Sequence, residues 1–404
     1  MPASRTKMLF RIIHGVGNSK VNVAVAHLSL NFLGGEERLC LSFIEALKLC
    51  NHRVTLFTIE QTDWAYVREF FGDVAKPNKE VFSTALVKRM DLVRASTVGT
   101  AYANYLIGLT RLIRKRKYDL VINTYGDLVS SFADVAYVHF PIKATLDYSQ
   151  IPAFVSPFKW TIYCQIYRLI ASVIDRINPS LLLTNSKFTQ QVVYKYLKRN
   201  AFVLHPPVDV HAYTSKSMDR ENYVITISKF TPKRHLHRVP LIAKNTRNAR
   251  FVIVGGADKY STKTISDLQK TINNFGVEDR ITLMPNVSRS RFVELLANAK
   301  VYLHVMPDEH FGISVIEAMA AGCVPVVHRS GGPWLDILEQ KQGKYGFSYA
   351  TPEEAAGIID NIMVDESMRS SISSAAKEHS SEYDESAFRR KLMNVLEKVG
   401  SIKR

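Results

Sequence analysis

The sequence predicts an α/β protein made of two doubly wound domains in tandem. Three observations support this prediction. Two series of short apolar runs alternate with helix-like segments, a proline-containing break separates the series, and 404 residues are too many for one ordinary core. Strands that alternate with helices favour parallel sheets covered on both faces. Ligands of such sheets bind at the carboxyl ends of the strands.

The first series of strand candidates begins at residue 21. Each candidate is short, apolar and bounded by turn residues, as expected of a buried strand. The candidates are residues 21–28, 52–58, 118–125, 135–140 and 180–186. The loop SLNFLGGEER (29–38) follows the first strand and leads into a helical stretch at 39–50.

The second series begins near residue 221. Its candidates are residues 222–228, 249–256, 280–287, 300–305 and 323–329. The segment 203–221 contains Pro206-Pro207 followed by polar residues, which is typical of a hinge. We therefore place a first domain at residues 1–208 and a second at 209–384, and expect the binding site in a cleft between them.

Composition limits the partners and the compartment. The chain has 53 Lys and Arg against 37 Asp and Glu, a net charge of +16, which favours an anionic partner such as a phosphorylated ligand, an anionic lipid surface or nucleic acid. The four cysteines show neither metal-ligand nor disulfide spacing, which is typical of a reducing compartment. No uncharged apolar run reaches about 18 residues, so we expect no membrane span.

Two stretches bear on membrane association. Residues 111–117 end a predicted helix with a cluster of Arg and Lys, either as charges that complement the helix dipole on a solvated face or as a basic surface. Residues 154–177 mix Phe, Trp and Tyr with Lys and Arg. They form either a buried helix or an interfacial helix that lies on lipid.

The stretch PDEHFGISVIEAMAAGCVPVVHRSGGP (307–333) combines carboxylates with a helix start. A helix that begins near Gly312 or Ser314, after a strand that ends at Asp308 or Glu309, offers free N–H groups to a phosphate. Glu317, one turn into the helix, can accept hydrogen bonds from a ribose diol, and Glu309 faces the group attached to the phosphate. A phosphate-linked sugar satisfies both features. The alternative is that both glutamates are first-turn charges stabilised by the dipole.

Three further features are candidates for phosphate binding or catalysis. In ISKFTPKRH (227–235), Lys229 and Arg234 can clamp a pyrophosphate, or this is a solvated basic loop. Gly34-Gly35 can form a phosphate-cradling turn, although it lacks the spacing of a dinucleotide fingerprint. His139 in YVHFP stands at a strand end, where it is either catalytic or structural.

Together these motifs resemble the family 4 glycosyltransferases of the GT-B fold, which carry two glutamates separated by seven residues. YVHFPI, TNSKFT, LHPPVDV, FVIVGGADK, PDEHFGI and SGGPWLDI follow the order seen in one subgroup, the α-1,2-mannosyltransferases of eukaryotic N-glycan assembly. The resemblance covers roughly residues 21–338. It implies two Rossmann-like domains that face each other across a cleft, with the final helix (about 385–404) returning to the first.

The resemblance also implies roles for individual residues. They are Glu309 at the transferred sugar, the backbone of Phe311, Gly312 and Ile313 near sugar and phosphate, Glu317 at the ribose, Lys229 and Arg234 at the pyrophosphate, Gly34 and Gly35 approaching it from the first domain, and His139 by the reacting centre. Glu309 and His139 are thus the expected catalytic residues.

The activity implied is that of a retaining glycosyltransferase, with mannose moved from GDP-mannose onto a lipid-linked oligosaccharide as the first expectation. The resemblance implies no metal or other cofactor, no nucleic-acid partner, and a cytoplasmic protein peripheral on the cytoplasmic face of a membrane. Four alternatives remain open from the residues: a UDP-linked donor, a soluble acceptor, a glycosidase built on two carboxylates, and a basic protein that binds membrane or nucleic acid without catalysis.

Overall fold

The computed structural model describes residues 21–82, 118–126, 133–141, 143–144, 165, 181–213, 220–247 and 249–401, with side chains as far as residue 395. The chain divides into two compact units, residues 1–207 with 388–404, and residues 208–387. The basic stretch 111–117 lies outside the described residues, and so does the aromatic stretch 154–177 except for Gln165.

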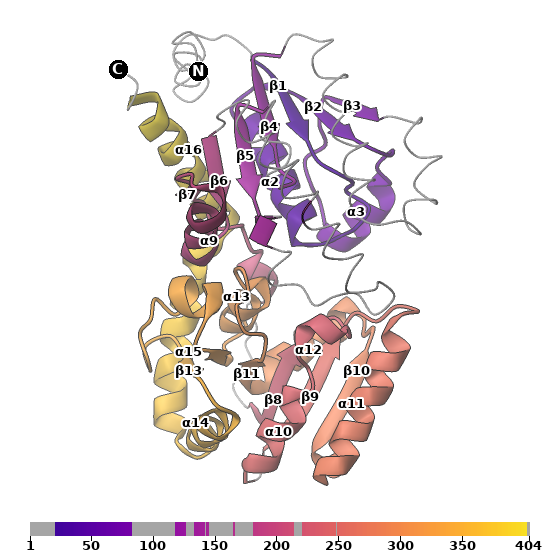
Figure 1. Ribbon diagram of the computed structural model, residues 1–404, viewed down its shortest axis with the longest axis vertical. Coiled ribbons are helices and arrows are strands. Elements are labelled where there is room, and N and C mark those ends of the chain that lie inside the picture. The colour runs from indigo at the N-terminus through magenta and orange to yellow at the C-terminus, as the bar shows by residue number, and fades with distance from the viewer. Residues whose placement is uncertain are drawn as a thin grey trace. The chain divides into compact units, whose positions relative to one another are not determined.

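The first unit contains a parallel sheet with the strand order β3-β2-β1-β4-β5-β6-β7 (Figure 1). The strands are β1 (Asn22–Ala26), β2 (Arg53–Thr58), β3 (Lys79–Phe82), β4 (Leu120–Asn123), β5 (Val135–Val138), β6 (Leu181–Thr184) and β7 (Phe202–Val203). The helices are α2 (Gly35–Leu49), α3 (Trp64–Phe71) and α9 (Lys187–Leu197), and α16 (Glu385–Ser401) joins them from the end of the chain. The predicted strands are confirmed as β1, β2, β4, β5 and β6.

Helix α2 begins at Gly35, so the prediction that the helix starts at residue 39 is wrong. The reason is local capping. The Glu37 carboxylate accepts a hydrogen bond from the backbone N–H of Gly34 at 2.6 Å, which satisfies a donor at the helix start. The acidic first turn also complements the helix dipole. The last four residues of the predicted loop, 35–38, are therefore helix.

Helix α16 packs on the core of the first unit. The Phe388 side chain is 1% exposed and meets the Phe43 ring edge to face, with centroids 5.5 Å apart. Arg389 adds an ion pair to Glu45 of α2 at 3.4 Å. Contacts from nearly opposite ends of the described chain thus complete one hydrophobic core.

The second unit contains a parallel sheet with the strand order β10-β9-β8-β11-β12-β13. The strands are β8 (Glu221–Ile227), β9 (Arg250–Gly255), β10 (Ile281–Pro285), β11 (Ala299–His304), β12 (Val324–His328) and β13 (Phe347–Tyr349). The predicted strands are confirmed as β8 to β12. Strand β11 ends at His304, so the prediction that it runs to Asp308 or Glu309 is wrong, and those residues belong to the following loop.

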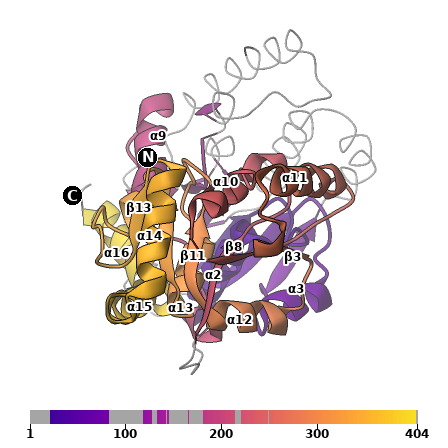
Figure 2. The ribbon, with the colours of Figure 1, turned by 90° about the horizontal axis from the view of Figure 1, so that it is seen from below.

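Helices cover both faces of this second sheet. One face packs against α10 (Arg238–Asn245), α11 (Ser261–Phe275) and α14 (Pro352–Val364). The other packs against α12 (Arg289–Asn298), α13 (Ile313–Ala320) and α15 (Glu366–Ser380). Figure 2 shows α10 and α11 on one side of β8 and β11, with α12 and α13 on the other. Two apolar faces explain why these strands read as continuous hydrophobic runs.

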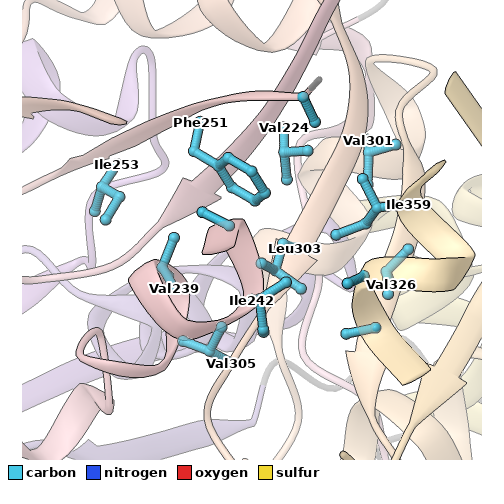
Figure 3. Close-up of a cluster of buried hydrophobic side chains, with 14 of the residues drawn as sticks. Val224, Val239, Ile242, Phe251, Ile253, Val301, Leu303, Val305, Val326 and Ile359 are labelled. Carbon is cyan, nitrogen blue, oxygen red and sulfur yellow. The ribbon is translucent and has the colours of Figure 1, made fainter. Parts of the chain in front are cut away.

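The core under α10 shows how the sheet is held (Figure 3). Phe251 of β9 and Leu303 of β11 lie among branched side chains from both helices and strands, including Val239 and Ile242. Burial of each such side chain stabilises the fold by about 1.5–3 kcal/mol. This packing fixes the carboxyl ends of the strands, from which the loops of interest emerge.

Both sheets reverse their strand order at one place, between β1 and β4 in the first unit and between β8 and β11 in the second. Loops that leave the two central strands there diverge to opposite faces, which opens a crevice for ligands. Among the described helices, none combines the length and the apolar character needed to cross a bilayer.

Replacing Phe388 by Ala should destabilise the first unit by about 3–5 kcal/mol, because the change leaves a cavity in its core. Arg389→Ala is the matched control on the next residue, where loss of a half-exposed ion pair costs about 0–1 kcal/mol. Urea denaturation followed by hydrogen exchange reports each unit separately. Equal midpoints for the two variants would contradict the packing described for α16.

Candidate functional site

The loops after β8 and β11 bring two predicted site residues together. Arg234 Nη1 donates a hydrogen bond to Glu309 Oε2 at 2.8 Å. The same oxygen lies 3.7 Å from Nε2 of His304, at the end of β11, and the backbone N–H of His310 donates to Oε1 at 3.1 Å. The carboxylate is 16% exposed. A carboxylate and a cation, predicted from motifs far apart in sequence, therefore form one site in the second unit.

The surroundings keep Glu309 ionised. Burial alone would raise its pKa, but the His304 side chain and the charge of Arg234 outweigh burial and hold the pKa well below the ordinary glutamate value. Glu309 therefore carries a negative charge across the neutral pH range.

Arg234 is positioned to bind an anionic ligand while it keeps its contact with Glu309. Its Nη1 contacts Glu309 and, at 3.3 Å, the Met306 sulphur. The guanidinium has five N–H donors in a planar fork, and 39% of the side chain is exposed. Lys229 is also exposed, and within the described part of the chain it forms no ion pair. Both predicted phosphate-binding cations thus have donors available to a ligand.

The start of α13 depends on the backbone of Gly312. The helix begins at Ile313, within the predicted window, and Gly312 caps it with φ +100° and no side-chain cap. A Cβ on this residue would lie 2.9 Å from Pro333 Cγ, so a larger side chain does not fit. The Phe311 ring is 3% exposed and packs on Tyr383, so the side chain belongs to the core of the second unit.

Glu317 is held by a residue that no sequence motif indicated. Tyr213 Oη donates to Glu317 Oε1 at 2.5 Å, and the Arg289 guanidinium lies 4.8 Å above the Tyr213 ring. Burial raises the pKa of Glu317, while Tyr213 and Arg289 oppose that rise. Tyr213 stands 104 residues before its partner in an unremarkable segment, so sequence spacing held no signal for this contact.

The glycine pair after β12 supports the Glu309 loop. A Cβ on Gly331 would lie 2.4 Å from the Glu309 carbonyl oxygen, and one on Gly332 would lie 2.5 Å from that of His310. The Gly332 N–H also donates to the Glu309 carbonyl at 2.8 Å, and the Asp308 N–H donates to Ser330 Oγ at 2.8 Å. Close backbone contact explains the glycines and holds Glu309 in place.

The first unit has its own polar centre between β1 and β4. His27, at the end of β1, contacts Thr124 Oγ1 through Nδ1 at 3.0 Å and Glu37 Oε1 through Nε2 at 3.5 Å. Both His27 and Glu37 are buried. Glu37 in turn accepts from Gly34, and Gly35 is the first residue of α2. The spacing from Gly34 to Glu37 is that of a capping box, a signal that sequence reading could have used.

His139 reaches the same centre. Its Nε2 lies 3.0 Å from the Thr124 carbonyl oxygen. Because a carbonyl only accepts, Nε2 carries the proton, and neutral His139 keeps a lone pair on Nδ1. Asn185 Nδ2 donates to the His139 carbonyl at 2.8 Å. The structure therefore connects the predicted positions Gly34 and His139 through side chains that were not predicted.

Acidic, histidine and cysteine side chains do not gather in threes as metal ligands anywhere in the described ranges.

Comparison with known proteins finds that the second unit is similar to one family. Residues 213–379 match the family described as "Glycosyl transferases group 1". The match contains Arg234, Glu309 and Glu317, and it begins at Tyr213.

Two curated relatives carry the same name. The chain is 25% identical over 295 residues to the GDP-Man:Man(3)GlcNAc(2)-PP-Dol alpha-1,2-mannosyltransferase of Dictyostelium discoideum, covering 67% of this chain and 56% of the relative. It is 29% identical over 279 residues to the protein of the same name from Neurospora crassa, covering 60% and 49%. The chain thus spans about half the length of these relatives.

Solved structures agree on the fold. The Anabaena protein Alr3699/HepE, crystallised with UDP and glucose, superposes with a TM-score of 0.69 at 18% identity, covering 94% of this chain and 100% of the other. At that identity the likeness establishes the fold alone, which is GT-B with two Rossmann-like units. Residues 213–379 of this chain are thus similar to the group 1 glycosyltransferases, and the chain has the GT-B fold.

Proposed function

We propose that this chain is a retaining hexosyltransferase that moves mannose from GDP-mannose to a dolichol-pyrophosphate-linked oligosaccharide. The proposal includes catalysis without a metal ion or other cofactor. It also includes peripheral attachment to the cytoplasmic face of a membrane. The relatives' name, GDP-Man:Man(3)GlcNAc(2)-PP-Dol alpha-1,2-mannosyltransferase, supports the donor and acceptor classes.

One observation carries the proposal. Arg234, in the loop after β8, lies 2.8 Å from an ionised Glu309, in the loop that leads from β11 to the helix start at Gly312, at the reversal point of the second sheet. A cation with spare donors beside a helix N-terminus suits a diphosphate. A carboxylate next to them would repel a bare phosphate, so it suits the sugar that the diphosphate carries.

The chemistry follows from these groups. Transfer breaks the bond between the sugar C1 and a phosphate oxygen, which leaves with the electron pair, while the acceptor hydroxyl adds to C1 on the same face and its proton passes to the departing diphosphate oxygen. Arg234, Lys229 and the amides at the start of α13 would stabilise the charge that develops on the diphosphate. Glu309 would stabilise positive charge at the sugar ring, and Glu317 would accept hydrogen bonds from the ribose.

The first unit contributes fewer candidate groups. We propose that the backbone of Gly34 and Gly35 contacts the diphosphate. We also propose that His139 contacts the substrate through Nδ1, because its Nε2 already donates a hydrogen bond to the Thr124 carbonyl. The Gly34 N–H is likewise used by Glu37, so Gly34 would serve through close backbone approach rather than as a donor.

The proposal predicts mannose transfer from radiolabelled GDP-mannose to a lipid-linked oligosaccharide. Glu309→Gln should lower kcat by about 10²–10³-fold, the usual effect of losing one preorganised electrostatic group, and leave GDP-mannose affinity within a few-fold. Glu294→Gln, which removes an exposed carboxylate of α12, should behave as wild type.

Absence of both product and free nucleoside diphosphate with several donors and acceptors would refute transferase activity. A wild-type kcat in Glu309→Gln would refute only the role of that residue. Faster turnover with a UDP-linked sugar than with GDP-mannose would show that the donor is the UDP-linked sugar.

Tyr213→Phe should weaken nucleotide binding and shift its pH dependence. The Tyr213 hydrogen bond lowers the pKa of Glu317, so its loss raises that pKa further. Glu317 then becomes protonated, and loses its acceptor function, at a higher pH than in wild type. A lost hydrogen bond of about 1 kcal/mol corresponds to roughly fivefold weaker binding near neutral pH.

Calorimetric titration with GDP from pH 5 to 8 measures both effects, and Glu317→Ala should abolish this pH dependence. Identical titration curves for Tyr213→Phe and wild type would exclude a role for this contact.

The net charge of +16 predicts binding to vesicles that contain phosphatidylserine. Flotation at about 0.05 M salt should carry the protein with these vesicles, and about 0.5 M salt should release it because the ions screen the attraction. Neutral phosphatidylcholine vesicles are the control. Failure to float at low salt would rule out an electrostatic membrane attachment.

A further inference from the structure

A chain of hydrogen bonds crosses the carboxyl-end edge of the first sheet. It begins at the Gly34 N–H, which donates to Glu37 (2.6 Å), and continues from Glu37 to His27 (3.5 Å). From His27 it passes to the Thr124 hydroxyl (3.0 Å), and the Thr124 carbonyl accepts from His139 (3.0 Å). This series of hydrogen bonds begins at Gly34 and ends at His139, which are both predicted to contact the substrate. The residues between them, His27, Glu37 and Thr124, are buried.

The contacts fix the protonation state of His27. Thr124 Oγ1 donates its single proton to the Ala26 carbonyl at 3.1 Å, so the oxygen can only accept from His27 Nδ1. The Glu37 carboxylate on the other side also only accepts. Both ring nitrogens therefore carry protons, and His27 is a buried cation. Burial opposes this state, but the pKa of His27 is raised overall, and the hydrogen bond and charge of Glu37 favour the protonated ring.

A buried ion pair is a costly way to fill a core, because apolar residues of similar volume often stabilise a protein better. Its presence at this edge of the sheet therefore suggests a role other than stability. We propose that His27 and Glu37 are a positioning pair, which holds the Gly34 turn through Glu37 and orients His139 through Thr124. The inference rests on the proposed function, because it assumes that Gly34 and His139 act on the substrate.

Positioning has a measurable consequence at Thr124. Thr124 is not proposed to contact the substrate. Its carbonyl accepts a hydrogen bond from His139 Nε2 and so determines which nitrogen of His139 is protonated, and its hydroxyl is hydrogen-bonded to His27. Displacement of a reacting group by about 1 Å costs on the order of 100-fold in rate. A change at Thr124 should therefore appear in kcat.

The kinetic test uses variants of the full chain. Thr124→Val keeps the shape and removes the hydroxyl, and should lower kcat on the order of 10–100-fold with little change in the KM for GDP-mannose. Thr124→Ser restores the hydroxyl and should recover most of the loss. Glu37→Gln removes the charge but keeps an acceptor for Gly34, and should lower kcat as well. Glu45→Gln, on the same helix but outside the chain of contacts, is the matched control. Wild-type kcat in both Thr124→Val and Glu37→Gln would overturn the inference.

A second readout does not depend on activity. Nitrogen-15 NMR of labelled histidines should show a doubly protonated His27 and an Nε2–H tautomer for His139 in wild type. Thr124→Val should shift the His139 signals, and Glu45→Gln should not. A neutral His27, or an unchanged His139 signal in Thr124→Val, overturns the positioning role. If these signals are as expected and no donor supports turnover, the proposed function fails while the pair still orients His139.

Discussion

Strand order is the constraint on which the candidate sites depend. In both sheets the order reverses between the first strand of the unit and the fourth, which are β1 with β4 and β8 with β11. The strands are parallel, so their loops leave at one edge, and at the reversal those loops diverge to opposite faces. In the first unit, His27 and Thr124 directly follow the two central strands. In the second unit, Arg234 and Glu309 lie in the loops that follow the two central strands.

Each reversal point contains a cation paired with a carboxylate, and the difference in burial separates their uses. Arg234 is 39% exposed and has donors left over, so a ligand can share it with Glu309. His27 and Glu37 are buried, and every polar atom of the His27 ring is already bonded. The exposed pair has N–H donors left to bind a ligand. The buried pair has all of its ring nitrogens in hydrogen bonds, so it can only hold neighbouring residues in place.

The sequence predicted the features that depend on local pattern. Alternating apolar runs located the central strands, and the step from strand to loop to helix located Gly312 at the start of α13. The edge strands β3 and β7 escaped prediction because they are short and partly exposed, which removes the apolar signal. Contacts over long sequence distances, such as Tyr213 with Glu317, have no periodic signature and need coordinates.

The glycines around Glu309 show why a motif can be recognised before its purpose is known. Gly331 and Gly332 end the stretch PDEHFGISVIEAMAAGCVPVVHRSGGP, and their missing side chains let two backbone segments touch. Gly312 fills a similar need against Pro333. Three glycines therefore build a tight support rather than a mobile one. A carboxylate held by backbone contacts and by Arg234 loses little freedom when a ligand arrives, and that preorganisation is what an electrostatic site requires. Because these glycines have no side chain, the neighbouring backbone and Pro333 pack directly against them, and this close packing makes the loop rigid.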